Sequence, residues 1–250
     1  MNKRPLEKIL RAFLNKPFYI ALINIFKYFD RPTDIIRRYV FGQGDYPKKL
    51  VVKTPLGKQE VWLYSFHDMI TMVECYGKLD YPAEKEISCV VDFGSNIGVS
   101  AGYFLTRNKN IKIYLFEPLP ENISRLKTNL QGFESRYELH EVAVGLENGH
   151  ADFGFEATGR YGGLKSNLPE TIQVQVRKVE EIISSILEKE DHIDILKIDV
   201  EGLETAIVKS LSFDNLKNIN RVYAETIYSE CLPGFDKEQY GEVVRFRKIL

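Results

Sequence analysis

Acidic side chains and glycines directly follow apolar runs at three places in the chain, and these residues are the best suited to binding chemistry. At the first place a strand-like run turns sharply and opens into a helical pattern over residues 99–105. Glycines let the backbone approach a ligand closely, and ligands of open α/β sheets bind beside such strand ends. The turn that we predict to bind a ligand contains Asp92, Gly94, Ser95, Asn96 and Gly98.

The composition of this turn indicates what it binds. In a dinucleotide-binding turn the place of Asp92 belongs to a glycine, and pyrophosphate lies on the helix N-terminus. Because a carboxylate repels phosphate, a zwitterionic ligand without phosphate fits better, and S-adenosylmethionine is such a ligand. Its amino group can engage Asp92 and backbone carbonyls, while its carboxylate can face the amides of the turn. The alternative is an ordinary tight turn between a strand and a helix.

A second carboxylate closes the next apolar run. Glu117 follows Tyr114–Phe116 and precedes Pro118, 25 positions after Asp92. Since a glutamate accepts hydrogen bonds at both oxygens, this spacing is typical of the residue that binds the two hydroxyls of a ribose. Together with the turn one strand upstream, Glu117 predicts a nucleoside site that includes Pro118.

A third group of charged residues belongs to the apolar run Ile193–Ile198. Lys197 lies within the run, and Asp199 and Glu201 follow it. We expect Asp199 and Glu201 to face a methyl donor and its acceptor, and Lys197 to hold either carboxylate. A hydroxyl acceptor needs a base that takes its proton, and Glu201 and Asp199 are the first choices. The alternative for Glu201 is a purely electrostatic role at the start of the next helix.

Four other residues are weaker site candidates. His67 is the third choice for the base, although a histidine at a helix start is more often a surface residue. Glu225 ends the next predicted strand at the same edge of the sheet. Arg160 and Tyr161 belong to a polar, glycine-rich insertion over Thr158–Asn167, a candidate lid or substrate loop that could orient a hydroxylated or anionic acceptor. A loop that merely turns is the alternative.

Short apolar runs that alternate with helical patterns position these residues. From residue 88 onward this texture is typical of an α/β fold with a mainly parallel sheet and helices on both faces. The sheet strands are predicted at Cys89–Phe93, Ile111–Phe116, Tyr137–Val144, Ile193–Ile198 and Arg221–Glu225. An extra β-pair is predicted at Ala151–Phe155 and Ile172–Arg177, on either side of the insertion.

Two segments precede this region. Residues 1–45 are predicted to be a helical extension, whose last short helix ends at Gly42. Residues 46–87 are predicted to hold a hairpin and a helix that is capped at Ser65. Residues 88–250 then form the ligand-binding domain.

The charge of the chain is balanced overall but unevenly spread. Hydrophobic residues make up 44% and charged residues 28%, which is typical of globular proteins. The formal net charge of -1 does not indicate any particular binding partner. Residues 1–50, however, contain eleven Lys or Arg and four Asp or Glu. A basic leader of this kind is either a solvated helical face or a surface that approaches anionic lipid or glycan. Nucleic acid is the least favoured partner.

Cysteine usage and hydropathy bear on location. Cys75, Cys89 and Cys231 lack zinc-site spacing, no cluster argues for a metal, and we interpret the cysteines as reduced thiols of a cytoplasmic protein. Phe18–Phe26 is too short to span a bilayer, is interrupted by Asn24 and lacks a cleavage site. Peripheral membrane contact through the basic helices stays open, and so does a homo-oligomer.

Taken together, these residues resemble the FkbM family of S-adenosylmethionine-dependent methyltransferases over residues 45–230. The first two motifs are shared by many methyltransferases, whereas the run from Leu196 to Gly202 is specific to this family. The segments that carry the resemblance are Asp80-Tyr81, Val91–Gly98, Phe116-Glu117-Pro118, Glu141–Gly145, Thr158–Gly162 and Leu196–Gly202.

The resemblance implies a Rossmann-like class I methyltransferase fold and O-methylation of sugars, glycolipids or polyketide-type metabolites, with S-adenosylmethionine as cofactor. It also implies that Glu141, Val142 and Ala143 border the adenine. In one respect the chain departs from the family, whose sheet normally ends in an antiparallel pair. Only 25 residues follow Glu225, and residues 236–250 are predicted as one helix. We therefore expect the last two strands to be absent, shortened or supplied by another chain, with an exposed sheet edge.

Two other functions remain open at this point. A non-catalytic nucleoside-binding or partner-docking module is suggested by the short C-terminus and the basic extension, and would bind a cofactor without turnover. A NAD-dependent oxidoreductase needs room for pyrophosphate at the first turn, and Asp92 argues against it. No residue pattern identifies the acceptor beyond a hydroxylated small molecule or a glycan.

Overall fold

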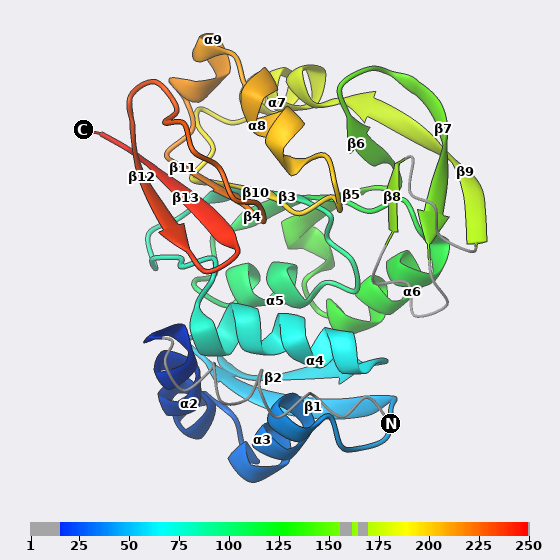
Figure 1. The fold of residues 1–250 in the computed structure, drawn as a ribbon, viewed down its shortest axis with the longest axis vertical. Coiled ribbons are helices and arrows are strands. Elements are labelled where there is room, and N and C mark those ends of the chain that lie inside the picture. The colour runs from blue at the N-terminus through cyan, green and yellow to red at the C-terminus, as the bar shows by residue number, and fades with distance from the viewer. Residues whose placement is uncertain (1–15, 156–161, 165–169, 250) are drawn as a thin grey trace.

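The computed structural model describes residues 16–155, 162–164 and 170–249, and arranges them as sheets and helices in stacked layers (Figure 1). Its helical elements are α2 (Lys16–Tyr28), α3 (Pro32–Phe41), α4 (Phe66–Val73), the π-helix η1 (Glu74–Lys78), α5 (Val99–Leu105), α6 (Pro120–Asn129), the 3-10 helix η2 (Glu134–Arg136), α7 (Val179–Leu187), α8 (Glu204–Ser210) and α9 (Phe213–Leu216). Its strands are β1 (Lys48–Thr54), β2 (Gly57–Leu63), β3 (Cys89–Phe93), β4 (Lys112–Phe116), β5 (Tyr137–His140), β6 (Ala143–Gly145), β7 (Gly149–Phe155), β8 (Gly162–Leu164), β9 (Glu170–Lys178), β10 (Ile195–Ile198), β11 (Arg221–Ala224), β12 (Phe235–Tyr240) and β13 (Val243–Lys248).

Seven strands form the central sheet in the order β12-β13-β11-β10-β3-β4-β5. The strands from β11 to β5 are parallel, while β13 and β12 are antiparallel. Helices α4, α5 and α6 lie on one side of this sheet, and α7, α8 and α9 lie on the other (Figure 1). The predicted α/β fold with a mainly parallel sheet and helices on both faces is confirmed.

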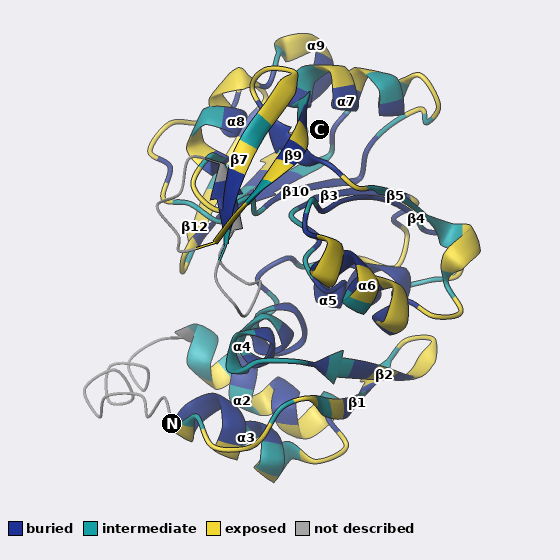
Figure 2. Ribbon diagram, turned by 90° about the vertical axis from the view of Figure 1, so that its right-hand side faces the viewer, coloured by how far each residue is buried: buried dark blue, intermediate teal, exposed yellow. Residues whose placement is uncertain are grey.

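Both faces of the sheet are packed, which explains why its strands are continuous apolar runs. Along β4, Ile113 and Leu115 join the apolar cluster on one side, while Tyr114 and Phe116 join the cluster on the other. Burial on both faces removes the alternation of polar and apolar residues that a half-exposed strand shows. The central strands are accordingly buried along their length, whereas the surrounding helices keep exposed outer faces (Figure 2).

The prediction of a C-terminal helix over residues 236–250 is wrong, and the last two strands are present. β12 and β13 form a hairpin, and β13 pairs with β11 in the register Val222↔Phe246. Val244 and Phe246 are fully buried, and they alternate with Arg245 and Arg247. This period of two is typical of a strand. The segment forms a strand rather than the predicted helix because it pairs with the free edge of β11.

The predicted strand Tyr137–Val144 is in fact two strands that belong to different sheets. β5 lies at the edge of the central sheet, whereas β6 pairs with β9 in a second, four-stranded sheet of order β6-β9-β7-β8. The predicted extra β-pair is confirmed as β7 and β9, which are antiparallel. β8 and the separation of β6 from β5 were not predicted from the sequence.

Helices α2 and α3 and the hairpin of β1 and β2 form a further layer, on the side of α4 that faces away from α5 and the central sheet (Figure 1). The hairpin of β1 and β2, the cap at Ser65 and the helix that ends at Gly42 are all confirmed, and Ser65 and Asp68 make a capping box. The apolar residues before α2 lie outside the described residues. One apolar cluster extends from α2 through β2 to α5, so the boundaries at residues 45 and 87 stay a prediction. Across the described ranges, no helix is both long and apolar enough to cross a membrane.

Candidate functional site

A cavity that is open to solvent lies at the carboxyl edge of the parallel strands. The ends of β3, β4, β10 and β11 contribute to it, as expected for an open α/β sheet. On the side of β4 and β6 its lining includes Glu117, Pro118, Leu119, Asn122, Ala143 and Phe153. On the side of β10, β11 and α4 the lining includes Asp68, Thr71, Glu74, Lys197, Asp199, Glu201 and Glu225.

The ammonium group of Lys197 is completely buried at the floor of this cavity. Its Nζ lies 2.9 Å from Asp92 Oδ1 and 3.2 Å from Asp199 Oδ2, and it donates a hydrogen bond of 3.2 Å to the Gly94 carbonyl. The ring of Tyr81 covers it at 5.4 Å. A buried charge is tolerated only when it is paired. Burial opposes the charged form, but the two carboxylates prevail and hold the pKa of Lys197 above its usual value.

The structure does not place Asp92 in the cavity lining. Its side chain is fully buried, and its second oxygen accepts a hydrogen bond of 2.6 Å from Ser100 on α5. Burial raises the pKa of Asp92, and Lys197 opposes that shift. With both oxygens engaged, Asp92 acts on the cavity through Lys197. Direct contact of Asp92 with a ligand stays a prediction.

The turn after β3 contributes its backbone to the cavity. Gly94, Ser95 and Asn96 line it, and Gly94 and Asn96 have positive φ angles of 79° and 46°. A Cβ on Gly94 would lie 1.7 Å from the carbonyl oxygen of Asp199, so only glycine lets the two loops approach this closely. Gly98 is not in the lining. It begins α5 and packs against Leu126 of α6.

Glu117 is the buried acid of the β4 side. Its Oε2 accepts a hydrogen bond of 3.0 Å from Asn96 N, and its Oε1 accepts hydrogen bonds from Leu119 N and the Asn122 side chain. Burial raises the pKa of Glu117 to about 7, against the effect of these donors. The predicted pair of turn and carboxylate is therefore in direct contact, and both face the cavity.

Of the three residues predicted to border adenine, one lines the cavity. Ala143 does so, whereas Val142 is buried in the apolar core and Glu141 is exposed and paired with Lys127 at 2.9 Å. Leu119 and Phe153 are apolar lining residues that were not predicted from the sequence. Phe153 belongs to β7, so the inserted sheet reaches the cavity, and the apolar alternation of that strand was the available signal.

Three predicted acidic residues meet at the β10 side. Asp199 is ion-paired with Lys197, and Glu225 lines the same part of the cavity. The charge of Asp199, together with burial, raises the pKa of Glu225 well above its usual range, because two carboxylates this close cannot both ionise. Glu201 has a left-handed backbone with φ of 57°, which costs energy in a residue other than glycine. It is exposed and lines the cavity.

Three other predictions have different outcomes. His67 lies on α4 beside Phe66 and is not among the lining residues. Arg160 and Tyr161 lie outside the described residues. Nearby Gly163 on β8 is described, and a Cβ there would lie 2.5 Å from the Glu201 carbonyl oxygen, so the inserted sheet packs directly on the loop after β10.

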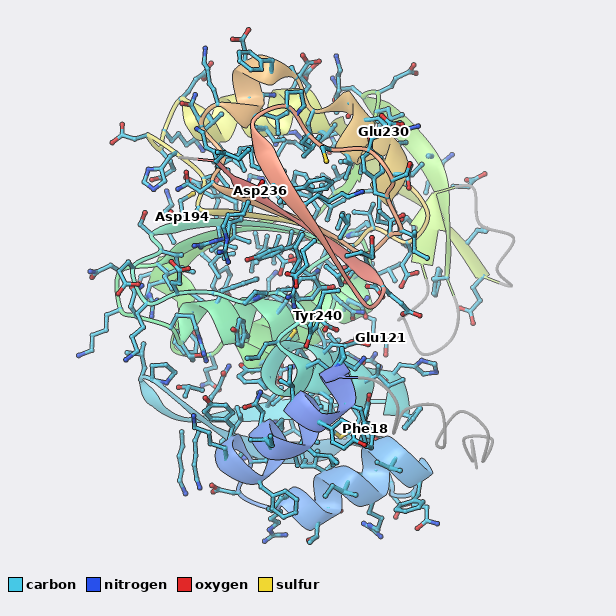
Figure 3. All side chains as sticks on the ribbon, turned by 60° about the vertical axis from the view of Figure 1, so that its left-hand side comes forward. Phe18, Glu121, Asp194, Glu230, Asp236 and Tyr240 are labelled. Carbon is cyan, nitrogen blue, oxygen red and sulfur yellow. The ribbon has the colours of Figure 1, made fainter. Side chains whose placement is uncertain are left out.

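The wall formed by α4 and η1 was missed by the sequence analysis. Asp68, Thr71 and Glu74 line the cavity from there, and Asp68 also accepts hydrogen bonds from Tyr64 N and Ser65 N as part of the helix cap. The capping pattern was recognised, but which way this helix faces depends on its packing. The tip of the C-terminal hairpin supports the wall, because Tyr240 donates a hydrogen bond to the Lys78 carbonyl at the end of η1 (Figure 3).

Acidic groups dominate the electrostatics of the cavity. Among its described lining residues Lys197 provides the positive charge, against the acidic side chains Asp68, Glu74, Glu117, Asp199 and Glu201, while the raised pKa of Glu225 keeps that carboxyl neutral near pH 7. Such a surface attracts a cation and repels phosphate. The described residues contain no group of His, Cys, Asp and Glu that could hold a metal ion.

Known proteins resemble this chain as follows. The family model described as the methyltransferase FkbM domain matches residues 92–247. Methyltransferase 1 of Beauveria bassiana is 25% identical over 197 residues, which cover 70% of this chain and 77% of that protein. The 2-O-methyltransferase NoeI of Sinorhizobium fredii is 28% identical over 186 residues, with coverages of 67% and 71%.

Among solved structures, the crystal structure of methyltransferase FkbM from Methylobacillus flagellatus matches 73% of this chain. The identity is 13% and the TM-score 0.43, and the match covers 54% of that chain. The present chain thus spans about half the length of that protein.

Replacing Gly94 with Ala tests the contact between the two loops. We expect Gly94→Ala to lower the free energy of unfolding by more than about 3 kcal/mol, because the new Cβ collides with the Asp199 carbonyl in addition to straining the backbone. Gly132→Ala is the matched control, since Gly132 also has a positive φ but nothing within 4 Å of a Cβ. Urea unfolding measures both. Equal losses in the two variants would contradict the close approach.

The raised pKa of Glu117 predicts a pH dependence of stability. The folded state binds this proton more tightly than the unfolded state, whose pKa is near 4.5. The stabilisation is therefore complete below about pH 4.5 and is lost as the pH rises toward about 7. Glu117→Gln lacks this titration. We expect the unfolding free energy of the wild type to fall relative to that of the variant across this window. If the unfolding free energies of the two proteins change in parallel with pH, Glu117 is not a buried carboxyl with a raised pKa.

Proposed function

Because the chain belongs to the FkbM methyltransferase family, we propose that it transfers a methyl group from S-adenosylmethionine to a hydroxyl oxygen of a sugar, glycolipid or related metabolite. The family has the class I methyltransferase fold, and the seven-stranded sheet with its antiparallel end has that form. The observation that best supports the proposal is the cavity that joins Glu117 and the glycine turn to a cluster of carboxylates.

The lining residues fit such a cofactor. Glu117 would hold the ribose hydroxyls, the backbone of Gly94, Ser95 and Asn96 would hold the amino-acid end, and Ala143 and Phe153 would border the adenine. When bound, S-adenosylmethionine supplies an electrophilic methyl group on a positively charged sulfur. The carboxylates of the cavity favour that charge. They disfavour the pyrophosphate of a nicotinamide cofactor, which argues against an oxidoreductase.

Glu201 is the residue that we assign as general base. It is exposed to the cavity, and its strained backbone is held by contact with Gly163. Asp199 is less suited to this role, because it is already ion-paired with the buried Lys197. Glu201 would accept the proton as the acceptor oxygen attacks, while the fixed walls of the cavity orient the acceptor.

The remaining polar walls suit an uncharged, hydroxylated acceptor. Asp68, Thr71 and Glu74 offer acceptor oxygens to hydroxyl groups, and their negative charge disfavours an anionic acceptor. The name of the similar NoeI protein, a 2-O-methyltransferase, agrees with a hydroxyl acceptor. Arg160 and Tyr161 are kept as proposed acceptor contacts, because β8, which follows them in the sequence, packs on the Glu201 loop.

Glu201→Gln separates the base role from cofactor binding. We expect transfer of the radiolabelled methyl group from S-adenosylmethionine into a cell glycan extract to fall by about 10²-fold or more. The Kd for S-adenosylhomocysteine in calorimetry should stay unchanged. Glu117→Ala, in contrast, should raise the Kd for S-adenosylhomocysteine.

Glu230→Gln serves as the control for removing one carboxylate, because Glu230 is exposed and pairs only loosely with Lys209 at 3.8 Å. It should match the wild type in both assays. Undiminished turnover in Glu201→Gln would remove Glu201 as the base. Undiminished binding in Glu117→Ala would contradict the proposed ribose site.

A further inference from the structure

The outer face of α2 carries large apolar side chains where a solvated helix carries polar ones. Tyr19, Ile23 and Phe26 are 51%, 67% and 60% exposed. Their spacing of four and three residues places them on one side of the helix. The opposite side is apolar as well, because Ala21 and Ile25 are buried in the core. A helix that is apolar on both sides is typical of one that has a partner on each.

The charge around this helix identifies the partner. Residues 16–64 contain nine Lys or Arg and four Asp or Glu, whereas the chain as a whole has a net charge of -1. Exposed basic residues of this layer are Lys27 and Arg31, which follow Phe26 closely in the chain, and Arg37, Lys49, Lys53 and Lys58, which also pair with Asp34, Glu60 or Asp30. Apolar side chains flanked by basic ones are the combination that binds the surface of an anionic membrane.

The inner side of α2 contacts the wall of the cavity. The Asn24 side chain donates a buried hydrogen bond of 2.7 Å to the Gly77 carbonyl of η1, and Glu74 of the same π-helix lines the cavity. A surface on which α2 rests would therefore lie one helical layer from the proposed site of methyl transfer.

We propose that the outer face of α2 docks on an anionic lipid surface, with Tyr19, Ile23 and Phe26 at the boundary between headgroups and acyl chains. The neighbouring lysines and arginines then contact lipid phosphates, and the helix lies in the plane of the membrane without crossing it. The proposal concerns location and does not require that the chain transfer methyl groups.

Sedimentation of the full chain with lipid vesicles tests this proposal. The wild type should bind vesicles that contain phosphatidylglycerol, bind vesicles of phosphatidylcholine alone at least about tenfold more weakly, and lose binding as salt rises. Ile23→Ser combined with Phe26→Ser should weaken binding to the anionic vesicles about tenfold or more. Both side chains point outward, so the thermal unfolding midpoint should not change.

Phe213→Ser is the matched control. Phe213 is 68% exposed on α9, which lies at the opposite end of the molecule from α2 (Figure 1). This variant should bind vesicles like the wild type. The proposal is overturned if the wild type does not bind anionic vesicles, or if the double variant binds as well as the wild type. A double variant that dissociates a dimer in sedimentation velocity while still binding vesicles would show that a second copy covers this face instead.

Discussion

The buried ammonium of Lys197 is the interaction on which the arrangement of the site depends. A charge in that position needs counter-charges, and the sequence supplies them from two separate elements, Asp92 within β3 and Asp199 after β10. β3 and β10 are neighbouring strands, so the ion pairs connect the loop after β10 to the end of β3, where the Asp199 carbonyl leaves no space for a Cβ on Gly94. The backbone that faces the cavity thus lies next to a buried ion pair.

The ion pairs of Lys197 also distinguish the acidic residues that are engaged within the protein from those that face the cavity. Asp92 and Asp199 pair with Lys197, and the charge of Asp199 together with burial raises the pKa of Glu225. Glu117 and Glu201 face the cavity from the β4 side and from the β10 side. The C-terminal hairpin also supports the site, because Arg245 donates hydrogen bonds to the Leu79 and Asp80 carbonyls and thereby holds the segment that follows Glu74. The hairpin is part of the structure around the site as well as of the sheet.

Local patterns in the sequence were sufficient for the central strands and for the pairing of Glu117 with the glycine turn, since strand ends of a parallel sheet meet at one edge. Local patterns were insufficient where the contacts of a residue depend on segments that are distant in sequence. Asp92 was expected to bind a ligand, but Lys197, which is 105 residues away, engages it first. The C-terminal strands were misjudged because their pairing depends on β11, and Asp68 and Glu74 were missed because helix packing decides which way they face. In each case a contact distant in sequence determined the outcome.

The central claim is that this cavity is built for a nucleoside that carries a positive charge and no phosphate. Calorimetric titration of one preparation with S-adenosylmethionine and with NADH tests it most directly. We expect saturable binding of S-adenosylmethionine and no measurable heat from NADH, because the acidic lining of the cavity attracts a sulfonium and repels a pyrophosphate. Tight binding of NADH with no binding of S-adenosylmethionine would contradict it.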